Sequence, residues 1–195
     1  MRPLRHGLLL AATAVLLASC GGIPRVAPGP FKVGSAQVTV GREWSDVTAL
    51  LPGASKKVRV LSIDGPLLNR LYVTDGLAPG DYLVKRQFKE RPTPLIRSDM
   101  TVTERIEFVA DSLSAMDYQR VETIRPRPAT LNGKPGIRFD IAAKTKDGLD
   151  IKGAAVAAEV AGRTYLVIYL APQQHYYEAT LAEAEAIMAS ARPGA

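Results

Sequence analysis

The most informative stretch of the chain reads TYLVIYL and covers Thr164–Leu170. It is almost wholly apolar, and its β-branched and aromatic residues favour a strand. We expect it to form the central and best-buried strand of a sheet. The turn dipeptides Asp147-Gly148 and Ala161-Gly162 precede it, so two reversals of the chain would bring earlier strands beside it.

Residues 137–141 alternate apolar side chains with Arg138 and Asp140. This period of two predicts a strand with one dry face and one face in water. The dipeptide Asn132-Gly133 is a strong hairpin signal, and it separates this strand from a candidate strand at Tyr118–Ile124. The later half of the chain therefore reads as a helix, a strand, a three-strand meander and a helix.

Two amphipathic helices flank these strands. Thr101 and Glu104 match a capping box, which marks the start of the first helix. Its apolar stripe consists of Val102, Ile106, Val109, Leu113 and Met116. A C-terminal helix is expected from about Gln173 to Ala191. Its apolar stripe consists of Tyr177, Leu181, Ala184 and Met188.

The earlier part of the chain offers further strand candidates, separated by Asp-Gly and Pro-Gly turns. They are the region with Val38, Val40 and Trp44, and the runs Val58–Ile63, Leu67–Val73 and Tyr82–Phe88. We expect the aromatic rings of Trp44, Tyr176 and Tyr177 to close the core; the alternative is that they line a groove.

These elements predict an α+β fold in which an antiparallel sheet is covered by two amphipathic helices. Their order resembles the PsbP-like α/β/α sandwich over roughly Phe31–Ala191. The chain also resembles small envelope lipoproteins with a similar terminal strand, TYLVIYLAP, followed by an aromatic-rich helix start. The resemblance implies a fold used by small extrinsic and envelope-attached binding proteins. It carries no catalytic residue.

Met1–Ser19 is expected to be a targeting segment and not part of the fold. Arg2 and Arg5 give it a positive start, and Leu8–Ala18 follows as an apolar run of eleven residues. That run is too short to cross about 30 Å of hydrocarbon, which takes about 20 residues. It suits the apolar region of a secretory signal.

Leu17-Ala18-Ser19-Cys20 ends this run. It matches, position by position, the lipobox of bacterial lipoprotein precursors: an aliphatic residue, two small residues and a cysteine. The resemblance implies that the Cys20 thiol receives a diacylglyceryl group, that a peptidase cleaves just before it, and that the new amine is acylated, for example with palmitate. The alternatives are a plain signal peptide with a chance cysteine and a cytosolic protein with an apolar start.

Acyl chains on Cys20 would attach the protein to a membrane. Gly21 stands where Gram-negative lipoproteins of the inner membrane tend to have aspartate, so the resemblance implies the outer membrane, facing the periplasm. We divide the chain into a signal peptide (1–19), a lipidated cysteine with a Pro/Gly tether (20–30) and a single α+β domain (31–195).

Composition excludes several other classes of protein. The chain has 195 residues, 47% of them apolar and 23% charged, which suits one folded domain and not a disordered or polytopic membrane protein. Its single cysteine allows no intrachain disulfide and no Cys-based zinc site. Removal of Arg2 and Arg5 with the signal peptide would lower the net charge from +6 to +4, which does not argue for nucleic acid as a partner.

Candidate catalytic residues are few. His175 is the single histidine after the signal peptide, and it could act as a general base or be a surface or packing residue at a helix start. The aspartates of Asp64-Gly65, Asp75-Gly76 and Asp147-Gly148 suit turns better than a cation site. One histidine and no free cysteine leave only carboxylates as ligands, and no Asp-x-Asp-x-Asp loop groups them, so we expect no metal. The sequence also has no glycine-rich phosphate loop, so we expect no cofactor.

Basic residues are densest from Lys85 to Arg97, and Arg120, Arg125 and Arg127 follow. A solvated strand face with its loop explains them, and the alternative is a patch that contacts anionic lipid headgroups or glycan.

The sequence thus favours a lipid-anchored envelope lipoprotein that acts as a non-enzymatic accessory or binding module. Its partner would be an envelope protein, a lipid or a glycan. The alternatives are a small envelope hydrolase that uses carboxylates or His175, and a structural subunit of an envelope assembly.

Overall fold

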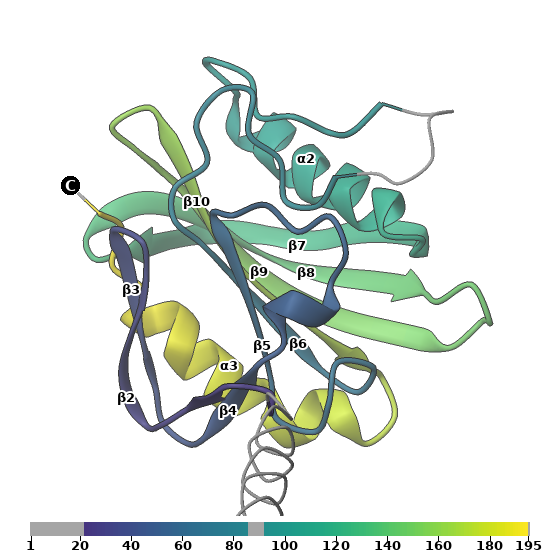
Figure 1. The fold of residues 1–195 in the computed structure, drawn as a ribbon. Helices are drawn as coiled ribbons and strands as arrows, with labels where there is room; N and C mark the ends of the chain where they lie inside the picture. The colour runs from purple at the N-terminus through teal and green to yellow at the C-terminus, as the bar shows by residue number, and fades with distance from the viewer. Residues whose placement is uncertain (1–21, 86–91, 195) are drawn as a thin grey trace, which may run out of the picture.

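A large antiparallel sheet forms the middle layer of the molecule (Figure 1). The computed structural model describes residues 22–85 and 92–194, and within them this sheet has eight strands. In spatial order the strands are β1 (Arg25–Val26), β4 (Trp44–Asp46), β5 (Val58–Ser62), β6 (Arg70–Thr74), β10 (Arg163–Pro172), β9 (Asp150–Val160), β8 (Lys134–Lys144) and β7 (Gln119–Leu131).

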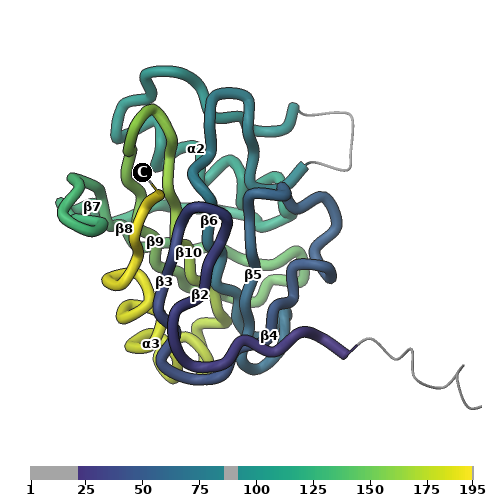
Figure 2. Tube along the Cα trace, turned by 60° about the vertical axis from the view of Figure 1, so that its left-hand side comes forward, coloured from purple at the N-terminus to yellow at the C-terminus, as the bar shows by residue number. Residues whose placement is uncertain are grey.

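Two helices and a hairpin cover the sheet. Helix α2 (Val102–Ala115) packs on one face. Helix α3 (Tyr176–Ser190) packs on the other, beside the hairpin formed by β2 (Gly29–Val33) and β3 (Ala36–Val40) (Figures 1 and 2). The predicted α+β class, with an antiparallel sheet covered by two helices, is confirmed. The hairpin is an additional cover that the sequence pattern did not predict.

Strand β10 lies in the interior of the sheet, between β6 and β9. Every residue from Thr164 to Pro172 is buried, which confirms the expectation for this stretch. Its side chains alternate between the two layers: Val167 and Tyr169 belong to the core under α3, whereas Leu166 and Ile168 belong to the core under α2. A continuous apolar run suits a strand that is covered on both faces.

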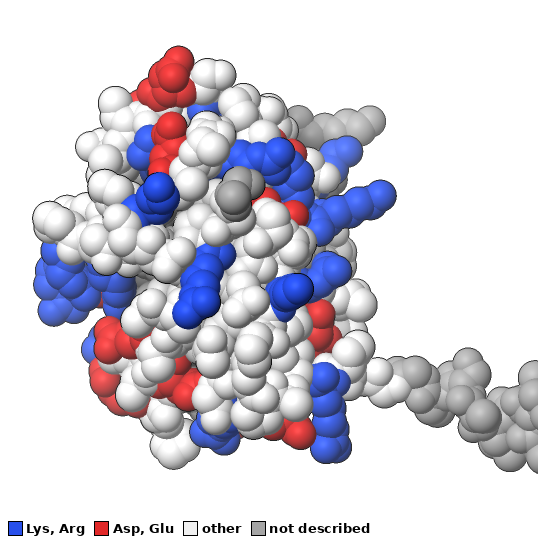
Figure 3. Space-filling view, turned by 90° about the vertical axis from the view of Figure 1, so that its left-hand side faces the viewer, with Lys and Arg blue, Asp and Glu red and all other residues white. Residues whose placement is uncertain are grey.

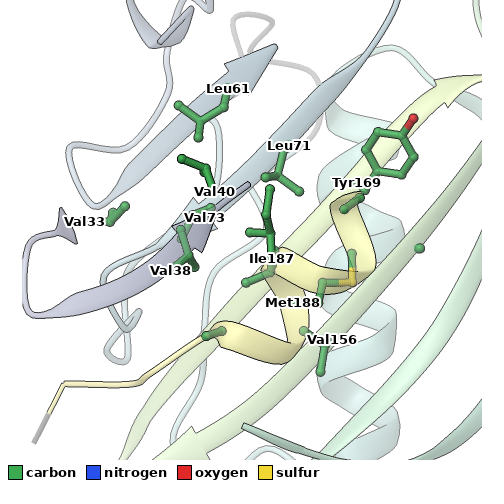
Figure 4. Packing of buried hydrophobic residues seen from close by; sticks show 14 of the residues in the cluster. Val33, Val38, Val40, Leu61, Leu71, Val73, Val156, Tyr169, Ile187 and Met188 are labelled. Atoms are coloured by element: carbon green, nitrogen blue, oxygen red, sulfur yellow. The ribbon is translucent and has the colours of Figure 1, made fainter. Parts of the chain in front are cut away.

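The core under α3 joins segments that are far apart in sequence. Ile187 and Met188 of α3 belong to one buried cluster with Val38 of β3, Val73 of β6 and Val156 of β9 (Figure 4). The backbone N–H of Thr39 also donates to the Ser190 hydroxyl over 2.8 Å, so the hairpin is tied to the end of the helix.

The predicted turns of the meander are present. Asn132 and Gly133 connect β7 to β8 with φ values of 48° and 75°, and Ala161 and Gly162 connect β9 to β10 with 50° and 70°. Two successive residues with positive φ match the tight hairpin turns that suit the twist of antiparallel strands. These short turns fix the order β7, β8, β9, β10.

The two helices begin close to where the sequence places them. Thr101 and Glu104 form the expected capping box, with the Thr101 N–H donating to Glu104 over 2.8 Å. The buried face of each helix differs from the predicted stripe. In α2, Val102 was predicted to be buried but is 49% exposed. In α3, the predicted Leu181 is only partly buried, whereas Ile187, which was not predicted, is fully buried. No helix among the residues described is both long and apolar enough to cross a membrane.

Two predicted strands differ in the structure. Strand β6 starts at Arg70, because the residues before it form a turn in which the Leu68 N–H donates to the Gly65 carbonyl. Residues 82–85 belong to no strand, and the remainder of the predicted strand Tyr82–Phe88 lies outside the described residues. Here the Asp81 carboxylate accepts the Ala78 N–H and pairs with Lys57, which favours a turn.

The folded domain begins earlier than residue 31. Arg25 and Val26, expected in the tether, form β1 and pair with β4, and residues 29 and 30 belong to β2. The Asp46 N–H also donates to the Pro24 carbonyl over 2.8 Å. Pro24 can precede β1 because an edge strand tolerates a missing N–H on its open side.

Candidate functional site

A groove of about 460 Å³ lies where α3 leaves part of the sheet uncovered, over β7, β8 and β9. Its volume falls in the range of small-molecule sites. Its charged lining residues are Arg125, Arg127, Arg138, Lys152, Asp140, Glu178 and Glu185. Ile124, Tyr177 and Leu181 add apolar surface. Figure 3 shows Lys and Arg side chains gathered at the left edge of that face, next to a group of Asp and Glu.

Asp140 on β8 is the centre of the charged cluster. Its carboxylate lies 2.8 Å from Arg125 Nε, 3.1 Å from Arg138 Nη1 and 3.4 Å from Arg127 Nη2. The residue is 7% exposed, so its charge needs a cation or hydrogen bonds nearby. Three guanidinium groups supply both.

Arg125 reaches Asp140 because β7 bulges at this point. Ile124 pairs with Asp140 and Arg127 pairs with Arg138, so two residues of β7 stand opposite one residue of β8. Arg125 adopts a left-handed backbone with φ of 52°. A β-bulge of this kind redirects side chains, and it brings Ile124, Arg125 and Arg127 to the same groove.

The charged side chains on the α3 side of the groove also form ion pairs. Arg138, whose side chain is 12% exposed, contacts Glu185 of α3 over 3.2 Å. Lys152 of β9 lies 3.9 Å from Glu178 and 5.7 Å from the ring centre of Tyr177. Burial raises the pKa of Tyr177, and the negative charge of Asp140 raises it further. The protonated Tyr177 hydroxyl donates to the Gly153 carbonyl over 3.5 Å.

The predicted wet face of residues 137–141 is largely enclosed. Phe139 and Ile141 are buried under α2, as expected. Arg138 and Asp140 face α3, where ion pairs replace much of their contact with water. The alternation of apolar and charged residues was read correctly, but it does not show that a helix shelters the charged face.

The structure does not bring His175 to this groove. His175 is exposed, precedes α3 with φ of 68° and contacts the ring of Tyr176 edge-on at 5.1 Å. None of the groove-lining residues described is His, Ser or Cys. The described part of the chain contains no group of three or more His, Cys, Asp or Glu side chains that could hold a metal ion.

The other candidate residues have mostly structural surroundings. The Asp75 carboxylate accepts the N–H and the hydroxyl of Ser35, so it joins β6 to the β2–β3 turn and is more than a turn residue. The Asp64 carboxylate accepts the Asn69 amide over 2.6 Å. Trp44 is buried in the core, as expected, and Tyr176 is partly buried against it. Tyr177 is buried too, but it also lines the groove, so both interpretations of this ring apply.

The basic stretch from Lys85 to Arg97 is only partly described, because residues 86–91 lie outside the described ranges. Arg97 pairs with Glu104 at the start of α2 over 2.5 Å. The sequence named Arg125 and Arg127 as basic residues, but it did not predict their convergence on Asp140. The signal available for that was weak: an Arg-Pro-Arg-Pro run, which is unusual in a regular strand.

Comparison with solved structures supports the predicted fold. Cyanobacterial PsbP (CyanoP) from Synechocystis aligns at 14% sequence identity with a TM-score of 0.53, covering 91% of this chain and 99% of that one. The Ran-binding protein Mog1p of Saccharomyces cerevisiae aligns at 9% identity with a TM-score of 0.51, covering 88% and 95%. The protein therefore has the PsbP-like fold. No family model matches the sequence, and no curated protein matches it either.

Proposed function

We propose that this protein is a lipid-anchored lipoprotein of the cell envelope that binds another envelope component through the groove beside α3. The anchor is supported by the Leu17-Ala18-Ser19-Cys20 lipobox and by Gly21 after it. In a Gram-negative cell, Gly21 favours the outer membrane over the inner one, with the domain in the periplasm. The PsbP-like fold is compatible with a small non-enzymatic accessory module.

The observation that carries the binding role is the groove itself. It has the volume of a ligand site, charged groups on four elements (β7, β8, β9 and α3) and apolar side chains at its rim. A hydrolase that uses carboxylates or His175 is less well supported, because His175 is not among the groove-lining residues and the carboxylates of the groove are paired with arginine or lysine. A structural subunit has no comparable feature among the residues described.

Photo-crosslinking in living cells tests this role. A photoreactive residue at Leu181, inside the groove, should give a discrete adduct of higher mass. The same residue at Leu149, which is 46% exposed in the β8–β9 turn and outside the groove, serves as the matched control. Equal adducts at both positions, or none at Leu181, would contradict a binding groove.

A further inference from the structure

The cations around Asp140 exceed what its carboxylate requires. Arg138 is enclosed and contacts both Asp140 and Glu185, so these three groups already form a paired network. Arg125 and Arg127 also contact Asp140, yet their side chains are 75% and 46% exposed. They therefore present N–H donors and positive charge at the mouth of the groove.

The backbone conformation that directs these two arginines into the groove is strained. A non-glycine residue in the left-handed region is strained by about 1 kcal/mol or more, and Arg125 has φ of 52°. In a regular strand, residues 124 and 127 would lie on opposite faces. The bulge puts Ile124 and Arg127 on the same groove, together with Arg125.

An apolar surface adjoins the two arginines. Ile124 is 40% exposed, and Leu181 of α3 is partly buried on the opposite wall. A ligand that matches both features carries a compact anionic group and an apolar portion. Guanidinium groups bind phosphate with two parallel hydrogen bonds, which a lysine cannot do.

We infer that Arg125 and Arg127 bind the phosphate of an amphiphilic ligand whose apolar portion lies on Ile124 and Leu181. This inference rests on the proposed binding role of the groove and specifies its ligand. The phosphate could belong to a membrane phospholipid or to a soluble phosphorylated amphiphile. The chemistry of recognition is the same in both.

Calorimetric titration of the mature full-length protein in dodecyl maltoside micelles, which contain no phosphate, tests the inference. Three probes separate the parts of the ligand: hexyl phosphate has both parts, inorganic phosphate has only the anion, and hexanol has only the apolar chain. Empty micelles correct for partition of the probes into the detergent. We expect hexyl phosphate to bind at least about tenfold more tightly than either other probe.

Substitutions then locate the site. Arg125→Gln and Arg127→Gln should each weaken hexyl phosphate binding about tenfold, because each removes a charge-assisted contact. Arg120→Gln is the matched control, since Arg120 is an exposed arginine of β7 with φ of 50° at a second irregularity of the same strand, outside the groove. Its affinity should change less than twofold.

The same titration in phosphatidylglycerol nanodiscs shows the source of the phosphate. Compared with the phosphate-free micelles, these discs should weaken hexyl phosphate binding if a membrane headgroup occupies the groove, and should leave it unchanged if the ligand is soluble. Absence of hexyl phosphate binding, or an equal loss in Arg120→Gln and Arg125→Gln, would overturn the inference. The crosslink at Leu181 does not depend on these probes, so a failure here is distinguishable from a failure of the binding role.

Discussion

Asp75 has a different structural role from Asp64 and Asp147, the aspartates of the other two Asp-Gly turns. Its carboxylate accepts the Ser35 N–H over 2.5 Å and the Ser35 hydroxyl over 2.7 Å. A Cβ on Gly34 would lie 1.8 Å from an Asp75 oxygen, so the turn is shaped around this carboxylate. The carboxylate therefore fixes the β2–β3 hairpin to the end of β6.

Asp75→Ala should lower the free energy of unfolding by about 1–3 kcal/mol, because it removes three hydrogen bonds to a charged acceptor, from the Ser35 N–H, the Ser35 hydroxyl and the Ala36 N–H. Asp147→Ala, in the exposed β8–β9 turn, should change it by less than about 0.5 kcal/mol. Urea unfolding measures both. Equal effects would mean that Asp75 is an ordinary turn residue.

Tyr118 gives the domain a specific sensitivity to alkali. Burial raises the pKa of Tyr118 to about 12, and Tyr72 beside it adds to the shift. An unfolded tyrosine has a pKa near 10, so between about pH 10 and pH 12 the unfolded chain loses a proton that the folded chain retains. Stability therefore falls as the pH rises through this window.

The slope from one tyrosine is at most about 1.4 kcal/mol per pH unit. Tyr118→Phe should make the decline in unfolding free energy above pH 10 shallower and leave the profile between pH 7 and 9 parallel to that of the wild type. Chemical unfolding at a series of pH values measures this. An unchanged slope above pH 10 would show that Tyr118 ionises normally in the folded protein.

Among the elements, helix α3 docks on the sheet through the buried residues Tyr177, Thr180, Ala184, Ile187 and Met188. Ile187 is fully buried against the sheet and the β2–β3 hairpin. Ile187→Ala should cost about 2–5 kcal/mol of unfolding free energy. Leu181→Ala, on the same helix but at the groove, should cost less than about 1.5 kcal/mol, since Leu181 is only partly buried. Thermal unfolding ranks the two variants, and the reverse order would contradict the observed packing.

The meander was predictable because its signals are local. Turn dipeptides and alternation fix β7 to β10, and the run Thr164–Leu170 is apolar on both sides. The buried face of α3 was harder to predict from the sequence, because the alanines around Ala184 allow several apolar faces. Which one packs is decided by the β2–β3 hairpin, a partner about 150 residues away in sequence.

The groove was not predictable for a related reason. Asp140 is surrounded by residues of β7 and β8, and Arg138 is paired with α3. Only tertiary packing brings these charges together, and only the bulge at Arg125 directs that side chain toward Asp140. A single sequence shows the arginines but not their common acceptor.

At the scale of the molecule, the early start of the fold shortens the predicted tether. If Cys20 is acylated, four residues separate it from Arg25 of β1, and the five steps along the chain span at most about 18 Å. Ser62, where the β5–β6 loop begins, pairs with Ser45, which in turn pairs with Arg25. That loop should therefore lie close to the bilayer.

Leu67 in this loop is 81% exposed, so a fluorophore at this position can report the distance between the loop and the bilayer. A fluorophore on Leu67→Cys should be quenched by headgroup-labelled lipid, since acylation of Cys20 would leave the new cysteine as the only free thiol. Arg163→Cys should be quenched much less, because β10 runs antiparallel to β6 and Leu170 pairs with Arg70, so the first residue of β10 lies at the other end of the sheet. Equal quenching at both positions would contradict a short link to the membrane.

The lipid anchor is the central claim, because the localisation and the short link to the bilayer depend on it. Mass spectrometry of the N-terminal peptide of the mature protein, taken from membranes, tests it most directly. The account predicts a chain that begins at Cys20 and carries two or three acyl chains, and a Cys20→Ser protein that is neither acylated nor cleaved normally. A free Cys20 thiol in a soluble mature protein would contradict it.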